Sequence, residues 1–182
     1  MIPQSSNLVL PADSLGSVGT QATIRPLTVA DAAAIAGIYN HYVVQTAVTF
    51  EAEPVSAARM KERIEETIPS FPWLGLELEG ELAGYAGASA WKSRCAYRYA
   101  VESTIYLRND FTGKGWGTSL YRRLIDEVRR LGFHSMIGGI ALPNSASERL
   151  HEKLGFKKIA HFEQVGWKFE RWIDVAYWQL LL

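Results

Sequence analysis

Three glycines that alternate with other residues, between an expected strand and an expected helix, constrain this chain most. Gly113, Gly115 and Gly117 follow the alternating segment 101–108 and lead into an amphipathic segment, 115–131. Glycine has no Cβ, so it suits a turn where the backbone must approach another molecule closely and no Cβ is tolerated. The first N–H groups of a helix bind phosphate because they are unsatisfied donors at the positive end of the helix dipole. The segment therefore predicts a strand, a turn and a helix, with a phosphate site at the turn.

The spacing of these glycines excludes two common phosphate-binding loops. A P-loop ends in Gly-Lys-Ser/Thr, whereas Lys114 here precedes Gly115. A dinucleotide fingerprint has its third glycine three residues after the second and lies on the first strand of its domain. Here Gly117 comes two residues after Gly115, late in the chain. The pattern alone is a weak signal, and an ordinary flexible turn is the alternative.

Length and composition predict one cytoplasmic domain. The 182 residues, 48% of them hydrophobic, are enough for one buried core. Nineteen basic residues balance nineteen acidic ones, so the net charge does not indicate nucleic acid or an anionic membrane as a partner. The single cysteine, Cys95, excludes an internal disulfide and a cysteine-based metal site. No apolar run approaches the ~20 residues of a membrane span. We expect no metal, nucleic acid or membrane among its partners.

The hydrophobic pattern predicts a mixed α/β fold. Residues 1–22, rich in Ser, Gly, Pro and Gln, are expected to form a flexible leader or a docking arm, and 23–182 a single domain. The predicted order is β-α-α-β-β-β-α-β-α-β-β, a mostly antiparallel sheet of about seven strands flanked by about four helices. The predicted strands cover 23–27, 73–78, 82–89, 101–108, 135–142, 156–165 and 172–181. Four helices are predicted. The first contains residues 34–39, and the others cover 56–67, 115–131 and 144–154.

With this element order, the glycine segment resembles the coenzyme A loop of the GNAT superfamily of acetyl-CoA-dependent N-acetyltransferases. That loop reads Gln/Arg-x-x-Gly-x-Gly/Ala, and Gly115 and Gly117 match its two glycines. Thr112 departs from the usual Gln or Arg, and Trp116 is bulkier than the usual aliphatic residue. Cradling by backbone N–H groups does not need either side chain, so the resemblance implies a pyrophosphate site here.

Further segments are similar to the phosphinothricin/methionine sulfoximine acetyltransferase family within that superfamily. They include Asn40-His-Tyr42, Val48-Thr-Phe50, Pro72-Trp-Leu74, Trp91-Lys-x-Arg94-x-x-Tyr97, Val101-Glu-Ser-Thr104, Leu142-Pro-Asn144, Leu150-His-Glu152 and Gly166-x-Lys168. The resemblance covers about residues 23–180. It implies acetyl-CoA as cofactor and a small amino-acid-like acceptor such as phosphinothricin, methionine sulfoximine or methionine sulfone. It also implies a homodimer whose interface completes the acceptor pocket.

Two residues are candidates for the chemistry of acetyl transfer. An ammonium must lose a proton before it attacks a thioester, so a base is needed. Glu102 shares a strand face with Thr104 and Tyr106, and the resemblance assigns the family's glutamate this role, directly or through a water. An exposed carboxylate in a cross-strand pair is the alternative. The resemblance also implicates His151 in proton handling or substrate positioning, with a purely structural helix histidine as the alternative.

The resemblance implies a cofactor site that acts mostly through backbone N–H groups. The strand would pair with the pantetheine arm, and the Leu107 N–H would stabilise the oxyanion. The loop would hold the pyrophosphate, and Asn144 would contact the pantetheine or act purely as a helix cap. The full set is Ile105, Tyr106, Leu107, Thr112, Gly113, Lys114, Gly115, Trp116, Gly117, Thr118, Ser119 and Asn144.

The acceptor site is expected to combine cations with aromatic walls. Lys92 and Arg94 would bind an anionic or polar tail, unless they form a solvated basic loop. Phe50, Trp73 and Tyr97 would wall a pocket, unless they are ordinary core residues. No sequence feature supplies Cys95 with a base, so we expect direct transfer without a covalent acyl-enzyme. The rival functions are acetylation of another amine, such as a protein N-terminus or a polyamine, and acyl-CoA binding without turnover.

Overall fold

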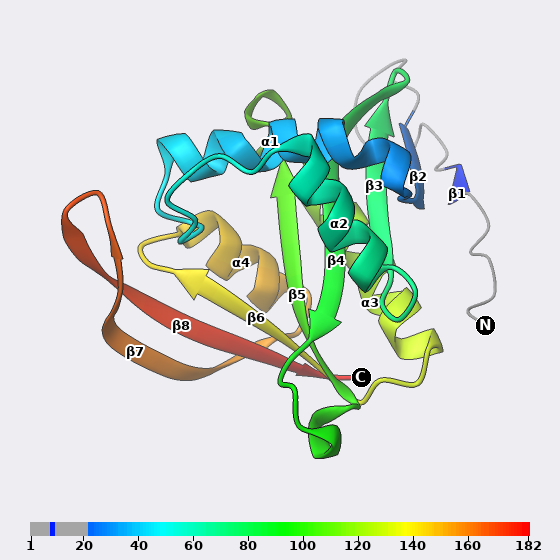
Figure 1. Cartoon of the computed structure of the whole chain (residues 1–182). Helices are drawn as coiled ribbons and strands as arrows, with labels where there is room; N and C mark the ends of the chain where they lie inside the picture. Colours follow the sequence, from blue (N-terminus) through cyan, green and yellow to red (C-terminus); the bar gives the residue numbers. More distant parts are fainter. Residues whose placement is uncertain (1–7, 10–21) are drawn as a thin grey trace.

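The chain is described here by a computed structural model that covers residues 8–9 and 22–182 (Figure 1). Leu8–Val9 form β1, which pairs antiparallel with β2 (Ala22–Pro26). The rest of the predicted leader lies outside the described residues. Within the described part of the chain, no helix is long and apolar enough to cross a membrane.

The predicted mixed, mostly antiparallel sheet is confirmed. Its described strands follow the order β1-β2-β3-β4-β5-β6-β8-β7, so seven strands of at least five residues are joined at one edge by the two-residue β1. Only the β5–β6 pair among them is parallel. The strands after β2 are β3 (Trp73–Leu78), β4 (Glu81–Ala90), β5 (Ala100–Leu107), β6 (Ser135–Ala141), β7 (Lys157–Lys168) and β8 (Arg171–Leu181).

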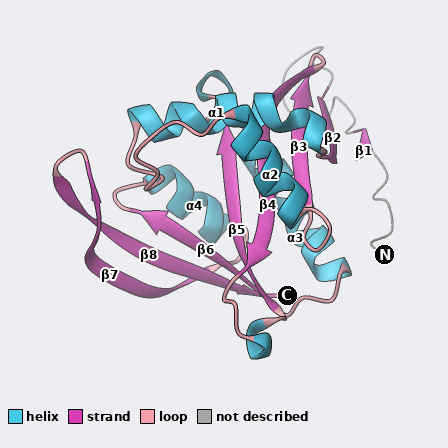
Figure 2. Cartoon of the chain, viewed as in Figure 1, coloured by secondary structure: helices cyan, strands magenta, loops and turns pink. Residues whose placement is uncertain are grey.

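The four predicted helices lie on the two faces of this sheet (Figures 1 and 2). α1 (Ala32–Gln45) and α2 (Ala57–Thr67) cover one face, and α3 (Trp116–Arg130) and α4 (Ser145–Lys153) lie on the other. Alternation along β5 separates the two cores as predicted: Val101 packs on the α3 side, and Tyr106 packs against the α1 and α2 cluster. Both strand faces are therefore covered.

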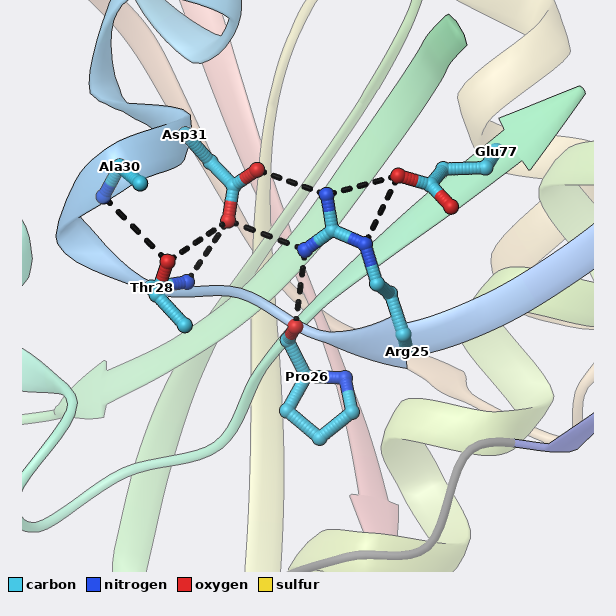
Figure 3. A network of polar contacts seen from close by, with 6 residues as sticks. All are labelled: Arg25, Pro26, Thr28, Ala30, Asp31 and Glu77. Atoms are coloured by element: carbon cyan, nitrogen blue, oxygen red, sulfur yellow. Dashed lines mark hydrogen bonds and ion pairs between the residues drawn. The ribbon is translucent and has the colours of Figure 1, made fainter. Parts of the chain in front are cut away.

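A polar network fixes the start of α1 against the sheet (Figure 3). The Arg25 guanidinium on β2 lies 2.7 Å from carboxylate oxygens of both Asp31 and Glu77. The backbone N–H of Thr28 donates to Asp31, and the Thr28 hydroxyl accepts from the N–H of Ala30. Thr28 therefore caps the short 3₁₀ turn before α1, whereas the Asp31 carboxylate joins β2 and β3 to this turn through Arg25.

The sheet opens between β5 and β6. The two strands pair over three residues only, from Ala100 opposite Ser135 to Glu102 opposite Ile137. β5 then continues to Leu107 beside β4, while β6 follows β8, and the two strands diverge (Figure 1). This divergence places an unpaired strand edge inside the sheet, at the predicted cofactor strand.

Backbone alternation shows which groups face this gap. The N–H of Arg108 donates to the carbonyl of Ala83 on β4. Successive amides of a strand point to opposite sides. The amides of Leu107 and Ile105 therefore point away from β4 and into the gap, and the amide of Tyr106 points toward β4. This geometry is what an extended ligand needs in order to pair with β5.

Candidate active site

A cavity of about 700 Å³ occupies the gap between β5 and β6. Its walls are the end of β5, the glycine loop, the end of β6 and α4. Ten of the residues predicted from the sequence line it, so one space brings together most of the predicted cofactor site. These are Ile105, Tyr106, Leu107, Thr112, Gly113, Gly115, Gly117, Thr118, Asn144 and His151.

The glycine loop forms the predicted turn, but two of its glycines are required by backbone conformation and not by the expected crowding. Gly113 has φ +75° and Gly115, the N-cap of α3, has φ +89°. A Cβ on either residue would meet nothing within 4 Å, so backbone conformation and not crowding requires glycine there. Gly117 differs, since its Cβ would lie 3.4 Å from the Leu107 side chain. The loop thus turns left-handed into α3 and presents the first N–H groups of that helix to the cavity.

Three predicted loop residues do not line the cavity. The Lys114 ammonium donates to the carbonyl of Asp110 at 2.9 Å. Trp116 is buried in the core on the α3 face of the sheet, which explains the bulky residue at this position. Ser119 lies one turn further along the helix and is half-buried.

Asn144 both caps α4 and lines the cavity. Its side-chain oxygen accepts from the N–H of Ser147 at 3.2 Å, so Asn144 is the cap of this helix. The preceding bond, Leu142–Pro143, is cis. The cap and the predicted pantetheine contact are compatible, because the Asn144 amide also carries two N–H donors.

Glu102 is half-buried on the α1 and α2 face of β5, next to the point where β5 and β6 part. Burial raises the pKa of its carboxyl, and the positive charge of Lys92 opposes the rise. A Cβ on Gly139, which lines the cavity, would lie 3.6 Å from a carboxylate oxygen of Glu102. The carboxylate therefore sits beside the cavity wall, in surroundings that make it a better proton acceptor than an exposed glutamate.

His151 is almost fully buried at the cavity wall, and both of its ring nitrogens have protein partners. Nδ1 lies 2.8 Å from the carbonyl of Ser147, and Nε2 lies 3.0 Å from the hydroxyl of Tyr121. Burial lowers the pKa of His151, although the bond to the Ser147 carbonyl favours its protonation. Gly138 on β6 makes room for the ring, because a Cβ there would lie 2.3 Å from Nε2.

The predicted acceptor residues are spread over three places. Trp73 lines a second cavity of about 250 Å³ on the α2 face, which shares Thr104 and Tyr106 with the main cavity. Phe50 packs on Gly166 of β7. A Cβ on Gly166 would lie 2.1 Å from the Phe50 ring, so only glycine fits there. Lys92 lies over the Trp91 ring at 4.4 Å, and Arg94 and Tyr97 lie on the same exposed loop. Within one chain these residues do not form a single pocket.

Sequence reasoning missed several residues that line the cavities. Arg149 and Lys153 lie one helical turn apart on α4. They are the two basic residues that line the main cavity. Their i, i+4 spacing beside the Asn144 cap was the available signal. Tyr39, Arg63 and Tyr85 line the second cavity, where α1, α2 and β4 meet only through tertiary packing.

Lys168, the last residue of β7, holds the segment that follows α1. Its buried ammonium donates to the carbonyls of Val43 and Thr49, at 2.7 and 2.8 Å. Burial lowers the pKa of this lysine. Val43 lies in the last turn of α1, where a cation is favoured by the helix dipole. The β7–β8 hairpin is thereby tied to the segment that carries Val48 and Phe50.

Comparison with known proteins gives consistent results. The family described as "Acetyltransferase (GNAT) domain" matches residues 24–177. The chain is 40% identical over 156 residues to a phosphinothricin N-acetyltransferase of Streptomyces viridochromogenes, covering 86% of this chain and 85% of that protein. It is 43% identical over 161 residues to an L-methionine sulfoximine/L-methionine sulfone acetyltransferase of Salmonella typhimurium, covering 88% and 94%. An acetyltransferase structure from Salmonella typhimurium, solved with its cofactor acetyl-CoA, superposes with a TM-score of 0.87 at 42% identity over 89% and 94% of the two chains.

Proposed function

The chain belongs to the GNAT acetyltransferase family, and from this premise we propose that it transfers the acetyl group of acetyl-CoA to the amino group of a small amino-acid-like acceptor. Phosphinothricin, methionine sulfoximine and methionine sulfone are the acceptors proposed, because they appear in the names of the relatives. The observation that carries the proposal is the coincidence of the β5–β6 gap, the glycine loop and Glu102 at one cavity.

The residues of the cavity fit the parts of acetyl-CoA. The inward-facing amides of Ile105 and Leu107 would pair with the pantetheine arm as a neighbouring strand does. Gly113, Gly115 and the start of α3 would bind the pyrophosphate. Arg149 and Lys153 on α4 would bind the 3′-phosphate of the adenosine. Acetyl-CoA supplies the activated acetyl group, and the chain supplies position, charge and a base.

In the proposed reaction Glu102 takes a proton from the bound ammonium, directly or through a water. The Leu107 N–H donates to the carbonyl oxygen as negative charge develops on it. The amine attacks the thioester carbon, the C–S bond breaks and the sulfur leaves with the electron pair. Holding both substrates in one cleft lowers the entropic part of the barrier. No covalent acyl-enzyme is required.

The test is a thiol-release assay with acetyl-CoA and a panel of amines. The panel comprises phosphinothricin, methionine sulfoximine, methionine sulfone, free amino acids, a polyamine and short peptides. We expect thiol release with the first three acceptors. Turnover with the peptides or the polyamine alone would favour the rival acceptors, and acetyl-CoA binding in calorimetry without turnover would favour a non-catalytic acyl-CoA-binding protein.

The charge of Lys92 is expected to set the lower end of the pH profile. Lys92→Met removes the positive charge that lowers the pKa of Glu102. Burial still raises this pKa, so the pKa should be higher in the variant. A base acts in its ionised form, so the acid limb of kcat/KM should move to higher pH, and the displacement should be largest at low salt. Arg94→Met, on the same loop, is the control whose limb stays in place. An unmoved limb in Lys92→Met would argue against Glu102 as the titrating base.

Arg149 is expected to bind the 3′-phosphate. Arg149→Ala should raise KM for acetyl-CoA by about 5-fold, with kcat nearly unchanged, because one exposed charge-assisted contact is lost. Acetyl-dephospho-CoA should show the same deficit with the wild type and no further deficit with the variant. Arg122→Ala, an exposed arginine on α3 away from the cavity, is the matched control. Equal losses in both variants would indicate a general charge effect.

We also propose a homodimer. Several large apolar side chains of the β7–β8 hairpin are exposed in the single chain, including Ile159, Phe162, Val165, Trp167 and Trp172. Exposed apolar area of this kind is typical of protein interfaces. The predicted acceptor residues are dispersed within one chain. A partner chain would bring a second set of them and could complete the pocket. Light scattering is expected to give twice the 20.3 kDa of the chain. The cytoplasmic location stays a prediction from the cysteine content.

A further inference from the structure

We infer that Tyr121 and Ser103 connect His151 to the acyl-transfer cleft, and that these three residues form a buried proton relay. The inference rests on the proposed function, since it assigns the relay to that reaction. The sequence assigned no role to Tyr121, and Ser103 stood out only as part of the segment Val101-Glu-Ser-Thr104. Tyr121 is one of several apolar-face residues of α3, and Ser103 is the serine that follows Glu102 on β5.

The relay is a continuous chain of short contacts from α4 to β5. The His151 Nε2 lies 3.0 Å from the Tyr121 hydroxyl, which lies 2.7 Å from the hydroxyl of Ser103. Ser103 in turn donates to the carbonyl of Ile137 at 3.1 Å. All three side chains are buried, with exposed fractions of 4, 0 and 7% for His151, Tyr121 and Ser103.

The chain ends where the sheet opens. Ile137 is the last residue of β6 that pairs with β5, so the Ser103 hydroxyl lies at the vertex of the cleft. Both Ser103 and His151 line the cavity. The two nitrogens of His151 are already bonded to Ser147 and Tyr121, so the imidazole exchanges protons with the cleft through the hydroxyls and not directly.

With neutral His151, the relay has one hydrogen fewer than it has hydrogen-bonding contacts, so it can accept a proton. The Ser147 carbonyl can only accept, so Nδ1 carries the ring hydrogen and neutral Nε2 accepts from Tyr121. The Ser103 hydroxyl can donate to the Ile137 carbonyl or to the Tyr121 oxygen, so two hydroxyl hydrogens serve three contacts. One added proton completes the set: Nε2–H donates to Tyr121, Tyr121 donates to Ser103, and Ser103 donates to Ile137.

In the reaction the relay accepts a proton from the acceptor and later donates a proton to the leaving thiolate. As the C–N bond forms, the nitrogen of the acceptor gives up a proton to the Ser103 hydroxyl, whose own hydrogen moves to Tyr121 and that of Tyr121 to Nε2. When the C–S bond breaks, the sulfur leaves with the electron pair, and the same path returns a proton to the thiolate. The relay is unchanged after one turnover. Glu102, on the opposite face of β5, serves the earlier deprotonation of the bound ammonium.

The surroundings of the imidazole favour its neutral form at rest. Gly138 of β6, Phe156 and Trp178 of β8 contact the ring and carry no charge. Tyr121 is the titratable group that faces it from α3, and burial raises the pKa of that hydroxyl. On α4 itself the charged residues are Glu148, Arg149, Glu152 and Lys153, which are half-buried or exposed. The capacity to accept a proton is thus present above the lowered pKa of His151 and lost below it.

The first test is made on the free protein by NMR titration of the His151 ring. Tyr121→Phe keeps the stacking on Phe156 and removes only the hydroxyl. The protonated ring then loses the acceptor for Nε2–H, so the pKa of His151 should fall further than in the wild type. Ser103→Ala keeps the bond between Tyr121 and His151 and should lower it less. An unchanged or higher pKa in Tyr121→Phe would overturn the relay.

The second test is kinetic. With the best acceptor of the panel, kcat should fall by about 10²-fold in Tyr121→Phe and in Ser103→Ala, with KM values little changed, and the double variant should lose no more than either single one. Ser135→Ala, a buried serine of β6 outside both cavities, is the matched control. If Tyr121→Phe does not fold, Ser103→Ala decides. Full kcat in the folded variants would overturn the relay, whereas a wild type without turnover would instead overturn the proposed function.

Discussion

Replacing Glu102 by Gln is expected to lower kcat by about 10² to 10⁴-fold and to leave KM for acetyl-CoA nearly unchanged. Gln keeps the shape of the side chain beside Gly139 but cannot take a proton at neutral pH. The measurement is steady-state kinetics with both substrates varied. A variant that keeps nearly wild-type kcat at every pH would show that another group is the base.

The stability of the same variant separates chemistry from misfolding. The pKa of Glu102 is raised in the folded chain, mainly by burial. A carboxyl of this kind stabilises the fold below its unfolded pKa, and this contribution is lost as pH rises through the folded pKa. At neutral pH the charged form therefore opposes folding, and Glu102→Gln should unfold at the same temperature as the wild type or higher. A clear fall in Tm would mean that the loss of activity has a structural cause.

Gly138→Ala is expected to lower both stability and turnover. The new Cβ would lie 2.3 Å from Nε2 and 2.8 Å from Cδ2 of His151, so the ring or β6 must move. Overpacking of a buried site costs about 1–3 kcal/mol, which for a chain of this size lowers Tm by roughly 2–12 °C. We expect a loss of kcat similar to that of Tyr121→Phe. Differential scanning calorimetry and the thiol-release assay measure the two effects.

A second substitution tests the cause. In Gly138→Ala with His151→Ala the added methyl occupies space that the ring has left, so this double variant should be at least as stable as His151→Ala alone while remaining slow. Gly37→Ala is the control for glycine substitution, because a Cβ at this α1 position meets nothing within 4 Å. It should raise stability by up to ~1 kcal/mol and leave kcat unchanged. A stable and active Gly138→Ala would contradict the packing that we describe around His151.

Local patterns were enough to predict the framework of the site. The alternating glycines predicted a turn between a strand and a helix, and the turn is present, with positive φ at Gly113 and Gly115. Alternation along β5 correctly separated Val101 from Tyr106. These signals are local, since each depends on neighbours within a few residues. The predicted roles of Glu102 and the loop in the reaction stay predictions until the variants are measured.

Features that depend on distant segments could not be predicted. The pairing of β5 with β6 stops at Glu102 because the strands follow different neighbours, β4 and β8, and no pattern within either strand sets that point. The partners of Tyr121 come from β5 and α4, so its sequence context shows only an apolar helix face. Trp116, singled out as an unusual loop residue, owes its size to the core under α3.

The unpaired edge of β5 also affects which molecules can add to the sheet. Exposed strand edges attract further strands and so promote aggregation. A peptide strand needs room for side chains above and below the sheet. At this edge Ile105, Leu107 and Leu150 all lie within 4.0 Å of the place where a Cβ on Gly117 would stand. We expect these side chains to disfavour the side chains of an added strand more than the slender, unbranched part of a pantetheine arm. We therefore expect the β5 edge to admit thin ligands more readily than a polypeptide strand, at the point where the sheet is most open.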